Sequence, residues 1–228
     1  MTRAIALLVA VMYCSATSQD IQAADPPRRD GELLQFLNLD CRDKDQDRKF
    51  QSALESTSPQ TLKRAEILVL YAQCLLRAKQ HASDAVPLLK EAVQILPANA
   101  GVRRHLGAAY FQLGMDQEAI EAYERSLELA PDADTYGQLG FVLMRAVSGL
   151  VVYLNPDTFN EYMARSEEQL RRAISLSLDN YMFHSHLGSC LIGRGKQEEG
   201  ISELHRAIDL IPTFKEWESP AHRAFALA

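Results

Sequence analysis

Two stretches of the chain repeat one pattern of large and small residues, and this repetition limits the folds that the chain can adopt. Residues 100–131 (AGVRRHLGAAYFQLGMDQEAIEAYERSLELAP) align without gaps with residues 181–212 (YMFHSHLGSCLIGRGKQEEGISELHRAIDLIP). The matched positions are Leu106-Gly107 with Leu187-Gly188, Tyr110 with Leu191, Gly114 with Gly195, Ala119 with Gly200, Tyr123 with Leu204, Ser126 with Ala207, and Pro131 with Pro212. An internal repeat of this length is typical of chains that stack one small unit on the next.

Each copy reads as two helices. Apolar residues recur with helical spacing at Leu106, Ala109, Tyr110 and Leu113, and again at Ala119, Ile120, Tyr123 and Leu127. Pro131 and Pro212 close the second helix, because proline lacks a backbone N–H and clashes with the preceding turn. No copy can bury its apolar side alone, so we expect the copies to cover one another.

The pattern resembles the tetratricopeptide repeat, a 34-residue unit of two antiparallel helices. A further copy over residues 65–97 carries Tyr71-Ala72, Leu75, Ala85, Leu89, Ala92 and Pro97, and a split copy occupies residues 133–144 and 165–180. The resemblance covers residues 65–212. It implies an all-α fold, an α-solenoid of antiparallel helix pairs that forms a superhelix of three to four repeats.

The third repeat in chain order contains an insertion near residues 147–160 (VSGLVVYLNPDTFN). Seven residues added to each helix rotate its apolar side by only about 20°, so the two helices can still face each other. We predict a lengthened helical hairpin with its tip near residues 154–157, Asn155 as the cap and Pro156 at the first helical position. An ordered loop is the alternative, because Gly149 inside a helix costs about 1 kcal/mol relative to alanine.

Three apolar side chains near the predicted tip have two interpretations. Val151, Val152 and Tyr153 form a docking site for a partner if they stay exposed. Alternatively, the tip folds back on its own neighbours, as apolar helices usually do.

The first 24 residues read as a signal peptide. Arg3 precedes an apolar run over residues 4–13, and small residues follow it. This pattern predicts export, to a bacterial periplasm. A lipid anchor at Cys14 is not expected, because the large Tyr13 precedes it where a small residue is required.

The remaining cysteines and the two ends of the array complete the domain organisation. In an oxidising compartment, Cys41 and Cys74 either form a disulfide or stay as buried free thiols. Residues 25–64 are predicted to be an N-terminal helical segment and degenerate repeat. The long helix that leads from this segment into the array is predicted to begin at Ser58-Pro59 and to end near Ala78. Residues 213–228 are predicted to cap the last repeat, with Trp217 as the anchor.

Composition and motifs exclude several function classes. A net charge of -6 argues against nucleic-acid binding, which needs clustered lysine and arginine. No catalytic motif is present, and His184 is expected to be a packed core residue. The acidic run at residues 43–47 lacks the glycine and the glutamate of a calcium loop, so we interpret it as a solvated turn. We expect no enzyme activity, no cofactor, no metal and no small-molecule substrate.

The resemblance also implies where a partner binds. In the family, certain positions of the first helix of each repeat line a concave groove. These positions hold Val69, Leu76, Arg77, Arg104, Phe111, Gln112, Phe141, Met144, Arg145, Met182 and Ile192 here, and the candidate binding residues among them are Arg77, Arg104, Phe111, Gln112, Phe141, Arg145, Met182 and Ile192. Arginine makes forked bonds to carboxylates, so we expect a protein or peptide partner of acidic character. Alternatively, these arginines are solvated or paired with neighbouring acidic residues. The interpretation is an adaptor or assembly factor of the cell envelope; the alternatives are weak self-association through the hairpin and an accessory subunit of an envelope enzyme.

Overall fold

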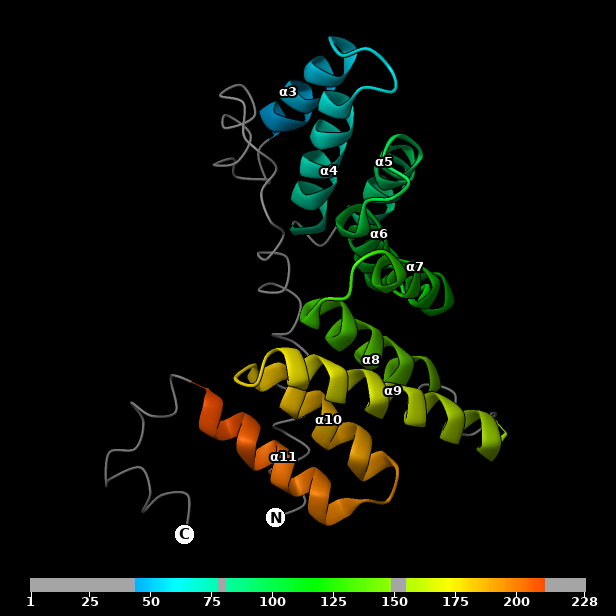
Figure 1. The fold of residues 1–228 in the computed structure, drawn as a ribbon. Helices are drawn as coiled ribbons and strands as arrows, with labels where there is room; N and C mark the ends of the chain where they lie inside the picture. Colours follow the sequence, from blue (N-terminus) through cyan, green and yellow to red (C-terminus); the bar gives the residue numbers. More distant parts are fainter. Residues whose placement is uncertain (1–43, 78–80, 149–154, 212–228) are drawn as a thin grey trace, which may run out of the picture. The chain divides into compact units, whose positions relative to one another are not determined.

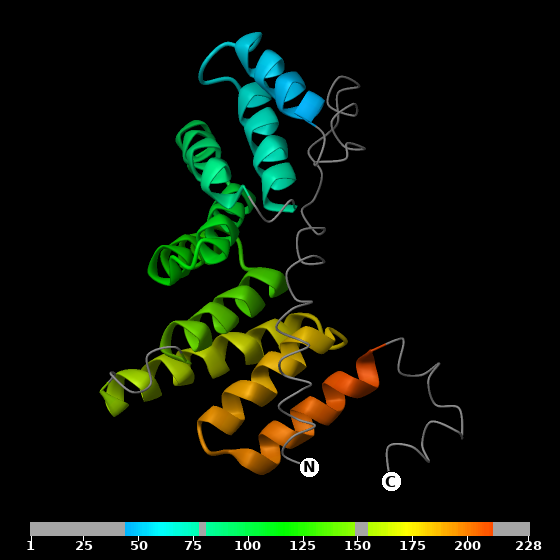
Figure 2. The ribbon, with the colours of Figure 1, turned by 180° about the vertical axis from the view of Figure 1, so that it is seen from behind.

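The computed structural model describes residues 44–77, 81–148 and 155–211, and every regular element within these ranges is an α-helix (Figures 1 and 2). The helices are α3 (Lys44–Glu55), α4 (Leu62–Arg77), α5 (Ala82–Ile95), α6 (Ala100–Gln112), α7 (Asp116–Leu129), α8 (Ala133–Ser148), α9 (Pro156–Leu176), α10 (Tyr181–Gly193) and α11 (Gln197–Leu210). The predicted all-α helical repeat fold is confirmed. None of the described helices has both the length and the apolar character needed to cross a bilayer.

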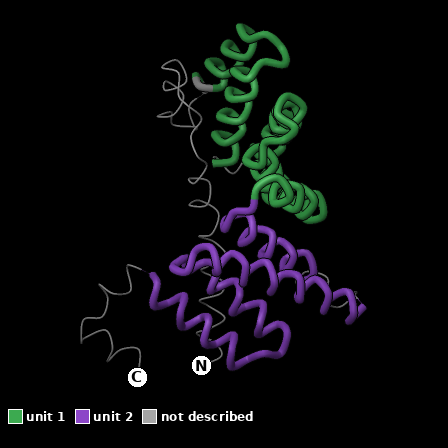
Figure 3. The backbone as a smooth tube through the Cα atoms, viewed as in Figure 1, with its two compact units in different colours: residues 1–130 green, residues 131–228 purple. Residues whose placement is uncertain are grey.

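The chain forms two compact units, residues 1–130 (unit 1) and residues 131–228 (unit 2), coloured separately in Figure 3. In unit 1, α4 pairs with α5 and α6 pairs with α7, while α6 also packs on α5. Leu89 of α5 and Leu106 of α6 share one buried core. Each helix pair therefore buries the side that its neighbour leaves open.

The N-terminal end of unit 1 is covered by α3. Its Phe50 is 1% exposed and lies in a small core with Ile67 and Cys74 of α4. The Phe50 ring stacks on Tyr71 with centroids 4.7 Å apart, and the Tyr71 hydroxyl donates to Asp47 at 3.2 Å. Burial, followed by the Asp47 charge, raises the pKa of Tyr71 to about 12.

Unit 2 repeats the same arrangement with α8–α9 and α10–α11, and α10 packs on α9. Leu170 of α9 shares a buried core with Leu187 and Leu191 of α10. The side-chain amides of Asn99 and Asn180 cap α6 and α10 at their N-termini. Both first helices end in a left-handed glycine, Gly114 with φ 73° and Gly195 with φ 78°, which turns the chain into the second helix.

The second arm of the predicted hairpin, α9, is lengthened in the described residues, whereas the connection over residues 149–154 lies outside them. Helix α9 has 21 residues, against 14 in α7 and in α11. Asn155 caps it, accepting a hydrogen bond from the Asp157 N–H at 2.9 Å, and Pro156 occupies the first turn, as predicted. Phe159 and Tyr162 pack against a core that includes Val147 of α8, so this part of the hairpin covers its own apolar side. The predicted docking residues Val151, Val152 and Tyr153 lie outside the described residues.

Two expectations about the N-terminal segment are wrong. Helix α4 begins at Leu62 and not at Ser58-Pro59, because Gln60 adopts a positive φ of 63° and Thr61 caps the helix by accepting the Arg64 N–H. The acidic run is helical and not a turn: Asp45 and Asp47 are exposed, as expected, but lie in the first turn of α3, where the helix dipole favours carboxylates.

We predict that Gly140→Ala lowers the free energy of unfolding by about 1–3 kcal/mol. A Cβ at this position would lie 2.6 Å from Leu170 Cγ and 3.2 Å from the Ser166 carbonyl oxygen, and backbone cannot move aside cheaply. Urea unfolding followed by circular dichroism measures the change.

Gly193→Ala is the matched control. Its Cβ would meet only the terminal methyl of Met163, which can rotate away, and alanine favours the helix. Equal destabilisation by both substitutions would contradict the close crossing of α8 and α9.

Candidate functional site

The first-helix face of unit 1 is formed by α4 and α6 and carries a neutral histidine between arginines. The Gln73 amide donates to Nε2 of His105 at 2.8 Å, which places the ring proton on Nδ1. Burial, with the charges of Arg104 and Arg77 in addition, lowers the pKa of His105 to about 3. His105 therefore stays uncharged at neutral pH, with the charges of two arginines acting on it.

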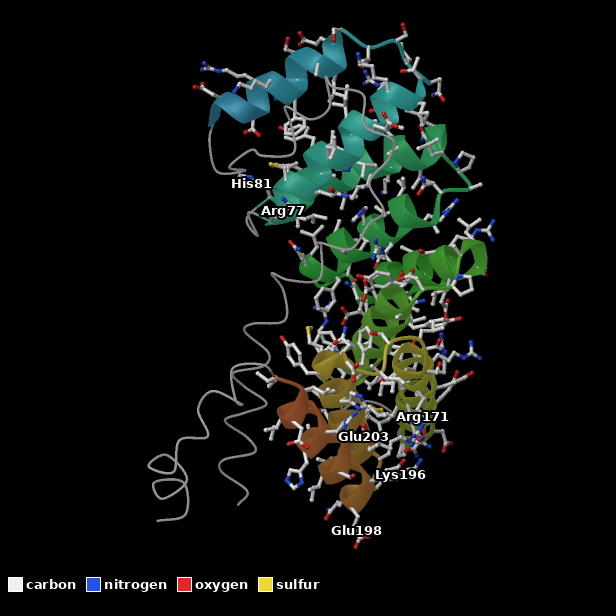
Figure 4. All side chains as sticks on the ribbon, turned by 60° about the vertical axis from the view of Figure 1, so that its left-hand side comes forward. Arg77, His81, Arg171, Lys196, Glu198 and Glu203 are labelled. Carbon is white, nitrogen blue, oxygen red and sulfur yellow. The ribbon has the colours of Figure 1, made fainter. Side chains whose placement is uncertain are left out.

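The same face ends in a half-buried amide beside an exposed arginine. The Gln112 amide donates to the Leu76 carbonyl at 3.2 Å, which ties the C-terminal ends of α6 and α4 together. Its Oε1 is enclosed and accepts no hydrogen bond from the part of the chain that the structure describes. Arg77, labelled in Figure 4, is exposed at the end of α4, and Phe111 is half-buried on α6.

In unit 2, the first helices α8 and α10 bring an aromatic pair together. The Phe141 ring stacks on His186 with centroids 4.3 Å apart and an interplanar angle of 18°. Burial lowers the pKa of His186 to about 4. Its Nδ1 is enclosed and has no hydrogen-bond partner within the described ranges. Arg145 and Ile192 are half-buried on the same two helices.

The two histidine contacts occupy equivalent places in the repeat. His105 and His186 both precede the Leu-Gly pair of a first helix, and Gln73 and Phe141 both follow the matching small residue of the preceding first helix. Sequence reasoning missed this pairing, although the recurring His-Leu-Gly triplet was its signal. The histidine thus joins two successive first helices in each unit.

The structure brings together only some of the residues predicted to bind a partner. Arg77 and Arg104 act on His105 in unit 1, and Gln112 reaches the residue before Arg77. Arg104 and Met182 are only 8% and 9% exposed, so little of either side chain is open to a ligand. The expected packed histidine, His184, is buried, with ring nitrogens 2.6 Å from the Glu203 carboxylate and 3.0 Å from the Leu178 carbonyl.

A second polar cluster, also missed by sequence reasoning, joins α9 to the turn between α10 and α11. Glu167 of α9 is 7% exposed and accepts hydrogen bonds from Arg171 at 3.0 Å, from Lys196 at 2.9 Å and from Arg194. Arg171 also pairs with Glu199 of α11. Figure 4 shows Arg171 and Lys196 close together in unit 2. The cluster ties the third repeat to the fourth.

These partners keep Glu167 charged. Burial acts to raise its pKa, but hydrogen bonds from Lys196 and Arg171 and the Arg194 charge outweigh burial and lower it below the ordinary value. A carboxylate with a lowered pKa stabilises the fold at pH values above its unfolded pKa. That contribution is lost as the pH falls through the folded pKa.

Charge is distributed unevenly over the helices of unit 1. The first helices α4 and α6 carry five cationic side chains and one carboxylate (Lys63, Arg64, Arg77, Arg103 and Arg104; Glu66). The second helices α5 and α7 carry two cationic side chains and seven carboxylates (Lys90 and Arg125; Asp84, Glu91, Asp116, Glu118, Glu121, Glu124 and Glu128). The basic residues of these four helices of unit 1 thus gather on the first helices, whereas in unit 2 three arginines (Arg165, Arg171 and Arg172) lie on the second helix α9.

Comparison with known proteins identifies the repeat. Residues 102–132 match the family model described as tetratricopeptide repeat. Over 95 residues, the chain is 32% identical to the peroxisomal targeting signal receptor of Eremothecium gossypii, a match that covers 42% of this chain and 15% of the receptor. The chain therefore corresponds to a small part of that relative.

Solved structures share the fold. A crystal structure of MamA has a TM-score of 0.59 at 22% identity, covering 74% of this chain and 88% of MamA. MamA from Desulfovibrio magneticus RS-1 gives a TM-score of 0.58 at 17% identity, with 83% and 99% covered. A thermophilic tetratricopeptide repeat protein of Thermus thermophilus gives 0.52 at 20% identity, with 77% and 84% covered. At these identities the likeness shows a common fold alone.

We predict that Glu167→Gln lowers the free energy of unfolding by about 2 kcal/mol, because the cationic partners lose the negative charge and one of the two accepting oxygens, and the new NH2 group faces cations. Glu168→Gln is the matched control at the next position: its ion pair with Arg172 is exposed, so the loss stays within about 0.5 kcal/mol. Equal losses in urea unfolding at pH 7 would show that the Glu167 cluster adds nothing beyond a surface pair.

We also predict that the two first-helix histidines make the fold sensitive to mild acid. Their pKa values are lowered in the folded chain, to about 3 for His105 and about 4 for His186. Below pH 6.5 the unfolded chain takes up protons that the folded chain does not, so the free energy of unfolding falls. Each histidine accounts for about 1–2 kcal/mol between pH 7.5 and pH 5.

The double variant His105→Gln/His186→Gln tests this, measured by urea unfolding at both pH values. It should lose less stability on acidification than the wild type does. His205→Gln, which removes an exposed histidine of α11, should behave as the wild type. An unchanged pH dependence in the double variant would refute the assignment.

Proposed function

We propose that the chain, a tetratricopeptide repeat protein in its repeats and its fold, is a non-enzymatic adaptor of the bacterial cell envelope. It binds an extended peptide or a helix of another protein on the first-helix faces of its units. The repeat and the fold support a role in protein–protein interaction. A relative that matches over part of its length is named as a receptor for a targeting signal, which supports recognition of another protein.

The observation that carries the proposal is the excess of cationic side chains on α4 and α6. Five cationic residues and one carboxylate give these two helices a sign opposite to that of the whole chain, whose net charge is -6. Arg64 pairs with Glu91 of α5 and Arg104 is buried, so Arg77 is the exposed cation on which the proposal rests. Complementary charge speeds encounter and selects among partners. The first-helix face of unit 1 therefore favours a peptide with acidic side chains.

The uncharged polar groups of the same face form contacts within the protein. His105 is buried and accepts a hydrogen bond from Gln73, and the Gln112 amide donates to the Leu76 carbonyl. These contacts hold α4 and α6 together beneath the exposed Arg77. In unit 2, the stacked Phe141 and His186 rings offer an apolar surface for a side chain of the same ligand class.

The cysteines support export. Cys74 is disulfide-bonded, and Cys190 is a buried free thiol. Disulfides persist in oxidising compartments such as the periplasm and are rare in the cytosol. Together with the signal-like first 24 residues, this favours a location in the cell envelope. Cys41, the partner expected from the sequence, lies outside the described residues.

The peptide proposal is tested with two fluorescein-labelled peptides, one with glutamate at alternating positions and a twin with glutamine. We expect the acidic peptide to bind the full chain saturably, several-fold more tightly than its twin, and more weakly as salt is added. Arg77→Glu should weaken binding several-fold, because it reverses an exposed charge on the first-helix face.

Arg125→Glu is the control, since Arg125 is also exposed but lies on the second helix α7. Fluorescence anisotropy gives the affinities. Equal weakening by both substitutions would show that the first-helix face is not the binding site. If neither peptide binds saturably, the proposed adaptor role of this face is wrong.

The export proposal is tested by counting thiols in the exported protein. After unfolding without a reductant, alkylation should label Cys190 alone, and with a reductant it should also label Cys74 and its partner. The mass of the exported chain should correspond to removal of the first 24 residues. A full-length mass, or all cysteines reactive without reductant, would contradict export through a cleaved signal.

A further inference from the structure

His184 of α10 lies between two hydrogen-bond acceptors. Its Nε2 is 3.0 Å from the carbonyl oxygen of Leu178, and its Nδ1 is 2.6 Å from a carboxylate oxygen of Glu203 on α11. A carbonyl oxygen can only accept a hydrogen bond, and the same holds for an ionised carboxylate. Both ring nitrogens therefore act as donors, which requires a proton on each of them.

The equivalent position of the second repeat carries a permanent cation. At the spacing that aligns the two copies, Arg103 corresponds to His184 and Pro97 corresponds to Leu178. Arg103 donates to the Pro97 carbonyl from Nε at 3.2 Å and from Nη2 at 2.9 Å. Arginine in one repeat and histidine in the other thus bind the same carbonyl, six residues earlier in the chain.

Both carbonyls lie just beyond the C-terminal end of a second helix. Helix α5 ends at Ile95, two residues before Pro97, and α9 ends at Leu176, two residues before Leu178. The C-terminal end of a helix carries a partial negative charge, and a nearby cation stabilises it. This place in the repeat therefore favours a positively charged donor over a neutral one.

Of the two aligned copies, only the one with the histidine places a carboxylate beside this position. Glu203 corresponds to Ala122 of α7 in the copy that carries Arg103. Arginine keeps its charge without help, whereas a histidine gains a proton more readily next to a carboxylate. The His184 and Glu203 side chains are only 8% and 24% exposed, so water screens the pair weakly.

Other charges near the pair are directed elsewhere. Within the described ranges, Glu203 is the charged side chain in contact with the His184 ring. The remaining titratable side chains of the adjoining segments are exposed, paired with carboxylates or stacked on a ring (Asp179, His205 and Arg206; Arg171 and Arg172; His186). Glu203 is thus the counter-ion of the ring.

We propose that His184 holds a proton on each ring nitrogen at pH 7 and, as an imidazolium, performs in unit 2 the task of Arg103 in unit 1. It clamps the end of α9 to α10 and α11. Unlike the arginine, it does so only while the second proton is in place, so the joint between the third and fourth repeats depends on that proton. The inference is separate from the proposed peptide binding and does not rest on it.

Nitrogen NMR of the isotope-labelled full chain at pH 7 reads the protons of the ring directly. We expect both ring nitrogens of His184 to give the signals of protonated nitrogens, assigned by their loss in His184→Arg. Glu203→Gln keeps the shape of the side chain but removes its charge, so Nδ1 should lose its proton. Glu198→Gln, at an exposed glutamate of the same helix (Figure 4), is the matched control and should change neither nitrogen.

Urea unfolding at pH 7 tests whether the position requires a cation. His184→Arg should keep the wild-type midpoint, because Arg103 binds the equivalent carbonyl, whereas the neutral donor of His184→Gln should lower it.

Three results would overturn the inference. A single protonated nitrogen in the wild-type ring would mean that His184 is neutral, and this reading needs no variant to fold. A proton that stays on Nδ1 in Glu203→Gln would remove Glu203 as the counter-ion. Equal losses in His184→Arg and His184→Gln would show that the position requires the shape of the ring and not its charge.

Discussion

In three repeats a glycine of the first helix lies directly against a large side chain of the second helix, and the rest of the structure depends on this contact. The pairs are Gly107 with Tyr123, Gly140 with Leu170, and Gly188 with Leu204. A Cβ at the glycine would come within 2.8 Å of the partner side chain in each case. The two helices therefore pack too closely to leave room for more than a hydrogen atom, and their remaining apolar sides must be covered by the next pair.

The joints between successive pairs add polar contacts to this apolar packing. In unit 1, His105 of α6 accepts a hydrogen bond from Gln73 of α4, and in unit 2, His186 of α10 stacks on Phe141 of α8. On the second-helix side of unit 2, Glu167 gathers its cationic partners around one buried carboxylate. Polar contacts between successive helix pairs favour one stacking arrangement, because a shifted arrangement would leave buried polar groups without their hydrogen-bond partners.

The sequence predicted the helix pairs and the long helix α9 because both follow from local patterns. The spacing of apolar residues set the helices, and Asn155-Pro156 set the start of α9 at its observed place. The predicted start of α4 at Ser58-Pro59 is wrong, because the positive φ of Gln60 belongs to a turn that Ser58-Pro59 does not specify. The division into two units was not apparent either, since the repeat runs through it.

The candidate site was harder to predict than the fold. Among the residues chosen by family position, Arg77 is exposed and Gln112 is half-buried, whereas Arg104 and Met182 are buried. Their burial depends on neighbouring helices and cannot be read from one helix alone. In the Glu167 cluster, Glu167 bonds residues that lie 27 and 29 positions away in the sequence, so no local sequence pattern predicts the cluster. The alignment of the copies shows the two histidines at equivalent positions, but only the structure shows that each contacts the preceding first helix.

Hydrogen–deuterium exchange of the full chain, followed by mass spectrometry with and without the acidic peptide, tests the central claim most directly. The account holds that second helices support the array while first helices bind the partner. It predicts that the bound peptide slows exchange in α4 and α6 and leaves α5 and α7 unchanged. Protection confined to α5 and α7 would contradict the account.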